Sequence, residues 1–183
     1  QIRSSAASDV YKRQGGANKT KQITTEGLEK TFATNQMNYF VLSTELIEII
    51  SESNDGRIVN VASNAHIGAE VDYENINSEK SFSAWTSYCV SKLMNIMFTY
   101  QLSSIQDKVS VNVLHPGFVD TNIAGNEGNF IKYIVKLGAK MFARTVDSGA
   151  DSSIYLSTSD EVQNVSGKYF FKCKEIKSSR ASY

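Results

Sequence analysis

The sequence predicts an α/β fold in which helices cover both faces of a parallel β-sheet. Three short segments, residues 57–63, 109–115 and 168–171, are rich in β-branched or aromatic residues and are predicted strands. Longer segments with helical spacing of apolar residues alternate with them along the chain. This alternation is typical of a parallel sheet joined by right-handed crossovers. The 183 residues are enough for one domain with a hydrophobic core.

The first predicted helix begins near Gly27, with Thr24 or Thr25 as its N-cap. Asn35 lies on the apolar stripe of this helix. A buried amide without hydrogen-bond partners costs about 1–3 kcal/mol, so Asn35 is either a satisfied core amide or a functional group. From its position alone, the core amide is the favoured interpretation. The stripe recurs at helical spacing and consists of Leu28, Phe32, Tyr39, Leu42, Leu46 and Ile49.

Two further helices complete the predicted alternation. One is expected over residues 83–105, after an irregular polar loop at 64–80. The other is expected to begin near Thr145, ahead of the third strand. Between the second strand and this helix, apolar residues at 130–142 suggest one or two helical turns that offer an apolar lid.

Composition narrows the classes of function. The formal net charge is zero, so nothing indicates a nucleic-acid partner. Cys89 and Cys173 form neither a metal-binding spacing nor a disulfide framework, and they favour a reducing, intracellular compartment. No apolar run reaches membrane-spanning length. Residues 1–14 lack periodicity and resemble translated adapter sequence, so we interpret them as a non-native tail; the alternative is a flexible natural tail.

Polar residues follow two predicted strands at the edge where such sheets bind ligands. Ser63 ends one strand, and its hydroxyl could donate to a substrate oxygen; the alternative is a turn or cap role. Pro116, Gly117 and Thr121 follow the next strand as P-G-x-x-x-T. Proline ends the strand, glycine lets the backbone approach a ligand, and threonine offers a hydroxyl. The alternative for these three residues is a plain strand-terminating turn.

Tyr88 and Lys92 lie four residues apart in the sequence YCVSK. On a helix this spacing places both side chains on one face. A free tyrosine has a pKa near 10, and a nearby ammonium group lowers it. A tyrosine tuned in this way can give a proton to a carbonyl oxygen or take one from an alcohol. Because this spacing arises by chance about once in several hundred residues, a structural or solvated pair is the alternative.

Taken together and in this order, the serine, Y-x-x-x-K and P-G-x-x-x-T motifs resemble the short-chain dehydrogenase/reductase family. The segments RIVNVASNAH (57–66), LHPGFVDTNI (114–123) and SGKYFFKCK (166–174) resemble more narrowly its retinol-dehydrogenase-like branch. The resemblance implies a Rossmann-type doubly wound parallel sheet, with residues 15–183 as a partial domain. The family's glycine-rich phosphate loop is absent from the sequence, so we expect an interior fragment, truncated at the N-terminal side and shortened at the C-terminal side.

The resemblance also implies a role for each candidate residue. Ser63 matches the serine that orients the substrate oxygen, and Tyr88 matches the acid/base. Lys92 matches the lysine that lowers the tyrosine pKa and holds the nicotinamide ribose. Asn35 matches the asparagine that supports a proton-relay water, which reverses the interpretation from position alone. The residues implied in cofactor binding are Gly16, Tyr88, Lys92, Pro116, Gly117 and Thr121.

The implied activity is reversible hydride transfer between NADP or NAD, with NADP slightly favoured, and a small-molecule carbonyl or alcohol. An apolar substrate is expected, such as retinal or retinol, an aldehyde, a ketone or a steroid, and no metal is implied. The alternatives are a nucleotide-sugar epimerase or dehydratase of the extended branch and a non-enzymatic binding relative. A homodimer is compatible with the sequence, as is a cytoplasmic or membrane-associated (endoplasmic reticulum) location of the full-length parent. Without the phosphate loop, the polypeptide as given is expected to be inactive.

Overall fold

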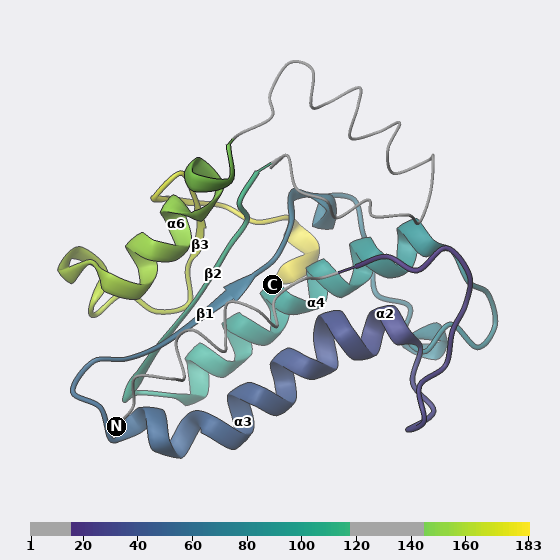
Figure 1. Ribbon diagram of the computed structural model, residues 1–183, viewed down its shortest axis with the longest axis horizontal. Coiled ribbons are helices and arrows are strands. Elements are labelled where there is room, and N and C mark those ends of the chain that lie inside the picture. The colour runs from purple at the N-terminus through teal and green to yellow at the C-terminus, as the bar shows by residue number, and fades with distance from the viewer. Residues whose placement is uncertain (1–15, 118–144) are drawn as a thin grey trace.

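The computed structural model describes residues 16–117 and 145–183, which form one mixed β-sheet with helices on both faces (Figure 1). The strand order in the sheet is β1-β2-β3-β4. The strands are β1 (Gly56–Val61), β2 (Val109–Leu114), β3 (Tyr169–Phe171) and β4 (Lys174–Ile176). The helices are α2 (Lys30–Phe32), a π-helix (Ala33–Met37), α3 (Asn38–Ser51), α4 (Ala84–Ile105) and α6 (Val146–Thr158).

The three predicted strands are present and parallel. β1 pairs with β2 over its full length, from Gly56 opposite Val109 to Val61 opposite Leu114. β2 pairs with β3 in the same direction. This arrangement confirms the predicted α/β class. It also brings the carboxyl ends of β1 and β2 to one edge of the sheet.

The sequence did not predict β4, which forms an antiparallel hairpin with β3. The two turn residues, Lys172 and Cys173, have φ angles of 50° and 59°. Two-residue hairpin turns with positive φ usually carry Asn or Gly. Here lysine and cysteine occupy those positions, so the usual turn signal is missing from the sequence.

The start of the first helix differs from the prediction. Neither Thr24 nor Thr25 is its N-cap. Glu29 caps α2, and its buried carboxylate accepts hydrogen bonds from the backbone N–H groups of Thr31 and Phe32, each at 2.9 Å.

The predicted apolar stripe is displaced by one residue in α3. Ser43, Ile47 and Ile50 lie inward in place of positions 46 and 49, while Leu42 stays half-buried. Leu46 and Ile49 are 43% and 60% exposed. The π-helix between Ala33 and Met37 explains the shift, because a π-turn adds one residue to a helical turn and rotates everything after it.

The helices cover the two faces of the sheet as predicted, with α3 and α4 on one side and α6 on the other (Figure 1). Alternate residues of each strand point to opposite faces. Ile58 and Val111 pack with Leu102 of α4, and Val59 packs with Leu156 of α6. Predicted helix starts at Ser83 and near Thr145 are confirmed, because both side chains accept hydrogen bonds as N-caps.

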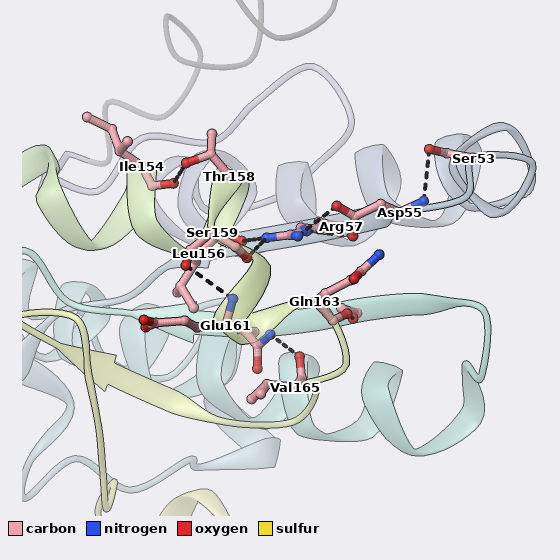
Figure 2. A network of polar contacts seen from close by, with 12 residues as sticks. Ser53, Asp55, Arg57, Ile154, Leu156, Thr158, Ser159, Glu161, Gln163 and Val165 are labelled. Carbon is pink, nitrogen blue, oxygen red and sulfur yellow. Dashed lines mark hydrogen bonds and ion pairs between the residues drawn. The ribbon is translucent and has the colours of Figure 1, made fainter.

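Arg57 on β1 ties the C-terminal end of α6 to the sheet (Figure 2). Its side chain is 7% exposed. The guanidinium group donates to both carboxylate oxygens of Asp55, at 2.7 and 2.6 Å. Its Nη1 donates to the carbonyl oxygens of Leu156 and Ser159, at 3.2 and 2.8 Å. Leu156 lies in the last turn of α6 and Ser159 is its C-cap residue, so both carbonyls are at the end where a helix leaves acceptors without intrahelical partners.

Arg57→Met is therefore expected to lower the free energy of unfolding by about 2–4 kcal/mol, because buried acceptors lose a charged donor. The measurement is denaturant unfolding of the full-length protein. Asp55→Ala serves as the matched control, since its carboxylate is 40% exposed and the carbonyl contacts of Arg57 remain. A larger loss for the control than for Arg57→Met would show that the helix cap is not the important contact.

Candidate active site

Ser63 follows β1 in an extended conformation and begins a short helical turn. Its Oγ accepts a hydrogen bond from the backbone N–H of Ala65 at 3.2 Å, so it has the cap role that the sequence left open. The same hydroxyl lies near the Tyr88 phenol and acts to lower the pKa of Tyr88. The structure therefore brings Ser63 and Tyr88 together, as predicted from their separate motifs.

Tyr88 lies on α4, where its ring packs against Trp85 with a centroid separation of 6.0 Å. Burial raises the pKa of its phenol above the usual 10, and the Ser63 hydroxyl partly opposes that effect. The net direction is opposite to the lowering expected from the Tyr–Lys spacing. The reason is that burial of the phenol outweighs the other influences on its proton.

Lys92 lies one helical turn after Tyr88 and is 4% exposed. Its Nζ lies 5.8 Å from the centre of the Tyr88 ring and donates to the backbone carbonyl of Val61 at 3.2 Å. Burial lowers the pKa of Lys92 to about 8. The ammonium group is thus held beside the phenol by a carbonyl rather than by a carboxylate.

The carbonyl oxygen of Val61 is a shared acceptor beneath the site. Besides Lys92, it accepts from Asn95 Nδ2 and from the Tyr39 hydroxyl, each at 3.4 Å. The sequence analysis missed both side chains. Asn95 carries a signal, since it follows Lys92 by three residues and so shares its helix face. No sequence pattern marks the Val61 carbonyl as their acceptor, because it is a backbone group on another element.

Asn35 is fully buried in the π-helix, and both the nitrogen and the oxygen of its side-chain amide have hydrogen-bond partners. Its Nδ2 donates to the Gly16 carbonyl and to Ser91 Oγ, both at 3.0 Å, and its Oδ1 accepts from the Gly16 N–H at 3.1 Å. Ser91 in turn donates to the Tyr88 carbonyl at 2.7 Å. Asn35 therefore joins the Gly16 loop to the helix that carries Tyr88 and Lys92.

Pro116 and Gly117 follow β2, at the strand end next to that of β1. Gly117 has a φ angle of 82°, a conformation that favours glycine, and its N–H donates to His115 Nδ1 at 3.2 Å. Thr121 lies outside the described residues, as do the tail 1–14 and the apolar segment 130–142.

The site combines a phenol, a hydroxyl and a buried ammonium group at the carboxyl ends of two parallel strands. These groups suit a ligand with a carbonyl or alcohol oxygen and a ribose hydroxyl, which is the pairing that a nicotinamide nucleotide and its substrate present. Within residues 16–117 and 145–183, no cluster of His, Cys, Asp or Glu could hold a metal ion. Over the same residues, no helix is both long and apolar enough to span a bilayer.

Comparison with known proteins identifies the family of this chain. The family model for short chain dehydrogenases matches residues 13–131. Human retinol dehydrogenase 14 is 38% identical over 156 residues, which cover 83% of this chain and 46% of that protein. Human polyprenol dehydrogenase is 31% identical over 168 residues, covering 87% of this chain and 51% of that protein. The chain thus spans about half the length of the curated relatives it matches.

Solved structures share the fold. A gluconate 5-dehydrogenase from Burkholderia cenocepacia J2315, in complex with NADP and tartrate, is 16% identical with a TM-score of 0.59 over 86% of this chain and 60% of that chain. A 3-oxoacyl-[acyl-carrier protein] reductase from Brucella melitensis with bound NAD is 23% identical with a TM-score of 0.54, over 76% and 48%. With the family match over residues 13–131, the chain belongs to the short chain dehydrogenase family, in the branch of the retinol dehydrogenases.

Proposed function

We propose that the protein containing this chain is an NAD(P)-dependent oxidoreductase that interconverts a carbonyl and an alcohol. The observation that carries the proposal is the convergence of Ser63, Tyr88 and Lys92 at one edge of the sheet. The Ser63 hydroxyl acts to lower the pKa of the nearby Tyr88 phenol, and the Lys92 ammonium group lies beside the same ring. Family membership supports this reading, because its curated relatives are named dehydrogenases.

In this proposal each side chain has one task. Tyr88 gives its phenolic proton to the carbonyl oxygen during reduction and takes it back during alcohol oxidation. Ser63 donates a hydrogen bond to the same oxygen, where negative charge develops. Lys92 binds the ribose hydroxyls and places positive charge near the phenol. A bound nicotinamide cofactor supplies or accepts the hydride.

Asn35, Gly16 and Gly117 would shape the cofactor end of the site. Asn35 fixes the Gly16 loop through two backbone hydrogen bonds, and Gly117 supplies a backbone without a side chain at the next strand end. We extend the cofactor surface to Pro116 and Thr121 on the strength of the P-G-x-x-x-T motif. Either NADP or NAD fits these contacts, and both occur in solved structures with this fold.

We further infer that the substrate is a largely apolar alcohol or aldehyde. The relatives include a retinol dehydrogenase and a polyprenol dehydrogenase, whose names denote long apolar alcohols. The segment at 130–142, with its apolar side chains, follows the candidate site in the sequence and matches such a substrate in polarity.

The test is a turnover assay of the full-length protein with NADPH and with NADH. The panel holds retinal, a polyprenal, a short polar aldehyde and a nucleotide sugar. We expect oxidation of at least one reduced cofactor with the apolar aldehydes and a much lower rate with the polar one. Turnover of the nucleotide sugar alone would favour an epimerase or dehydratase, and cofactor binding without any turnover would favour a non-enzymatic relative.

A further inference from the structure

His66 connects the candidate active site to the C-terminal end of the chain. Its ring is 1% exposed and packs edge-on against Tyr169, with centroids 5.3 Å apart. Its Nδ1 lies 2.8 Å from the carbonyl oxygen of Ser63. Its Nε2 accepts a hydrogen bond from the backbone N–H of Ser179 at 3.1 Å. Both ring nitrogens therefore have backbone partners. Ser63 lies three residues before His66 in the sequence, and Ser179 lies 113 residues after it.

The two partners determine the protonation state of the ring. A backbone N–H can only donate, so Nε2 must carry a lone pair. A carbonyl oxygen can only accept, so Nδ1 must carry the proton. The ring is therefore neutral and protonated on Nδ1. An imidazolium ion would place an Nε2–H against the Ser179 N–H, and burial of the ring lowers its pKa in agreement with the neutral form.

The segment that holds Ser179 is itself attached to α4. The Tyr100 hydroxyl hydrogen-bonds with Ser178 Oγ at 2.8 Å, and Ser178 Oγ hydrogen-bonds with Ser182 Oγ at 2.7 Å. The Tyr183 ring stacks on the Tyr100 ring with centroids 5.1 Å apart. The C-terminal segment is thus fixed to the helix that carries Tyr88, and the His66 ring joins this fixed segment to the Ser63 backbone.

We propose that His66 is a positioning residue. It holds the Ser63 backbone in place relative to Tyr88 through its own hydrogen bond to Ser179 in the C-terminal segment. The Nδ1–H donates to the Ser63 carbonyl, and the Ser179 N–H fixes the far side of the ring. The turn after Ser63 is otherwise held by local backbone hydrogen bonds, among them those from the N–H groups of Ala65 and His66, and by packing against α4, and His66 adds the contact to the C-terminal segment. This inference rests on the proposed function, because it assigns Ser63 a part in turnover.

Two substitutions at His66 separate its hydrogen bond to Ser63 from its hydrogen bond to Ser179. His66→Gln places an acceptor near the position of Nε2, so it can keep the Ser179 bond while losing the donor to Ser63. His66→Asn places a donor near the position of Nδ1, so it can keep the Ser63 bond while losing the acceptor for Ser179. Each variant loses one buried hydrogen bond and the ring, so the two form a matched pair in stability.

We expect His66→Gln to lower kcat about 10- to 100-fold, because small misplacement of a reacting group costs up to about 10²-fold. His66→Asn should lower kcat several-fold less, and cofactor KM should be unchanged in both. In a Ser63→Ala background, His66→Gln should cause no further loss, because it acts through Ser63. Unfolding of each variant in denaturant measures the stability for comparison.

A spectroscopic measurement tests the bridge without relying on activity. Long-range ¹H–¹⁵N correlation of histidine-labelled full-length protein at neutral pH should show His66 neutral and protonated on Nδ1. A ring protonated on Nε2, equal losses of kcat in the Gln and Asn variants, or full additivity with Ser63→Ala would each overturn the proposal. If the ring is protonated on Nδ1 but the wild-type protein turns over no substrate of the panel, the proposed function fails and His66 is only a structural bridge.

Discussion

Tyr88→Phe in the full-length protein is expected to lower kcat about 10²- to 10⁴-fold, which is the usual contribution of a positioned general acid–base group. The hydroxyl is the group proposed to exchange a proton with the substrate oxygen. Phenylalanine keeps the ring that packs against Trp85, so the fold should survive. Cofactor affinity should change little, because the Lys92 contact to Val61 remains.

The measurement is steady-state kinetics on an apolar aldehyde together with titration of the cofactor. Tyr73→Phe is the matched control, because it removes a hydroxyl from a ring that is 72% exposed. Turnover of Tyr88→Phe within a few-fold of the control would make the Tyr–Lys pair a structural feature of a helix face.

The raised pKa of Tyr88 also predicts a preferred direction. A phenol with a pKa above 10 keeps its proton across the neutral and moderately alkaline range, which suits the reduction of a carbonyl. Alcohol oxidation needs the phenolate, whose fraction at neutral pH is smaller the higher the pKa. The oxidation rate is therefore expected to rise with pH, while the reduction rate stays level until the phenol begins to ionise.

Much of the site was predictable because its residues belong to regular elements. Ser63 follows a strand with a clear β-branched pattern, and Tyr88 and Lys92 share a helix face through their spacing alone. Parallel strands then place the strand end and the helix together. Periodicity and sheet geometry left a cap role for Ser63 and a structural pair for Tyr88 and Lys92 as alternatives, and the proposed roles came from the family resemblance.

The remaining features depend on interactions that a linear pattern does not contain. The π-helix at Ala33–Met37 shifted the apolar stripe by one residue, so Leu46 and Ile49 face outward. The Val61 carbonyl is a backbone group, and nothing in the sequence marks it as a shared acceptor. The pKa of Tyr88 depends on how deeply α4 is covered, and spacing from Lys92 cannot report that burial.

Lys92→Met is expected to stabilise the full-length protein while removing most of its activity. The pKa of Lys92 falls from its usual 10.5 to about 8 because burial disfavours the ammonium ion. At pH 7 this lowering corresponds to about 3 kcal/mol of unfavourable free energy in the folded state. Methionine has similar length and no charge, and the Val61 carbonyl keeps its contacts with Asn95 and Tyr39. The expected net gain at pH 7 is about 1–3 kcal/mol.

The stability gained by Lys92→Met is expected to decrease as the pH rises. Below pH 8 Lys92 is protonated in both the folded and the unfolded protein, so the full cost of burying the charge is present. Between pH 8 and 10.5 the folded protein releases the proton before the unfolded protein does, and the stability of the wild-type protein rises with pH. The advantage of Lys92→Met should therefore shrink to about 1 kcal/mol or less near pH 10.

Urea unfolding at pH 7 and pH 10 measures the change in stability. Kinetics and cofactor titration at pH 7 measure the change in activity and in cofactor affinity. Lys108→Met is the control, because Lys108 is exposed and its replacement should change neither stability nor turnover. In Lys92→Met, cofactor affinity should fall if Lys92 makes the proposed ribose contact, and kcat should fall with the lost positive charge beside Tyr88. A loss of stability at pH 7, or a gain that is equally large at pH 10, would mean that burial of the Lys92 ammonium group does not destabilise the folded protein.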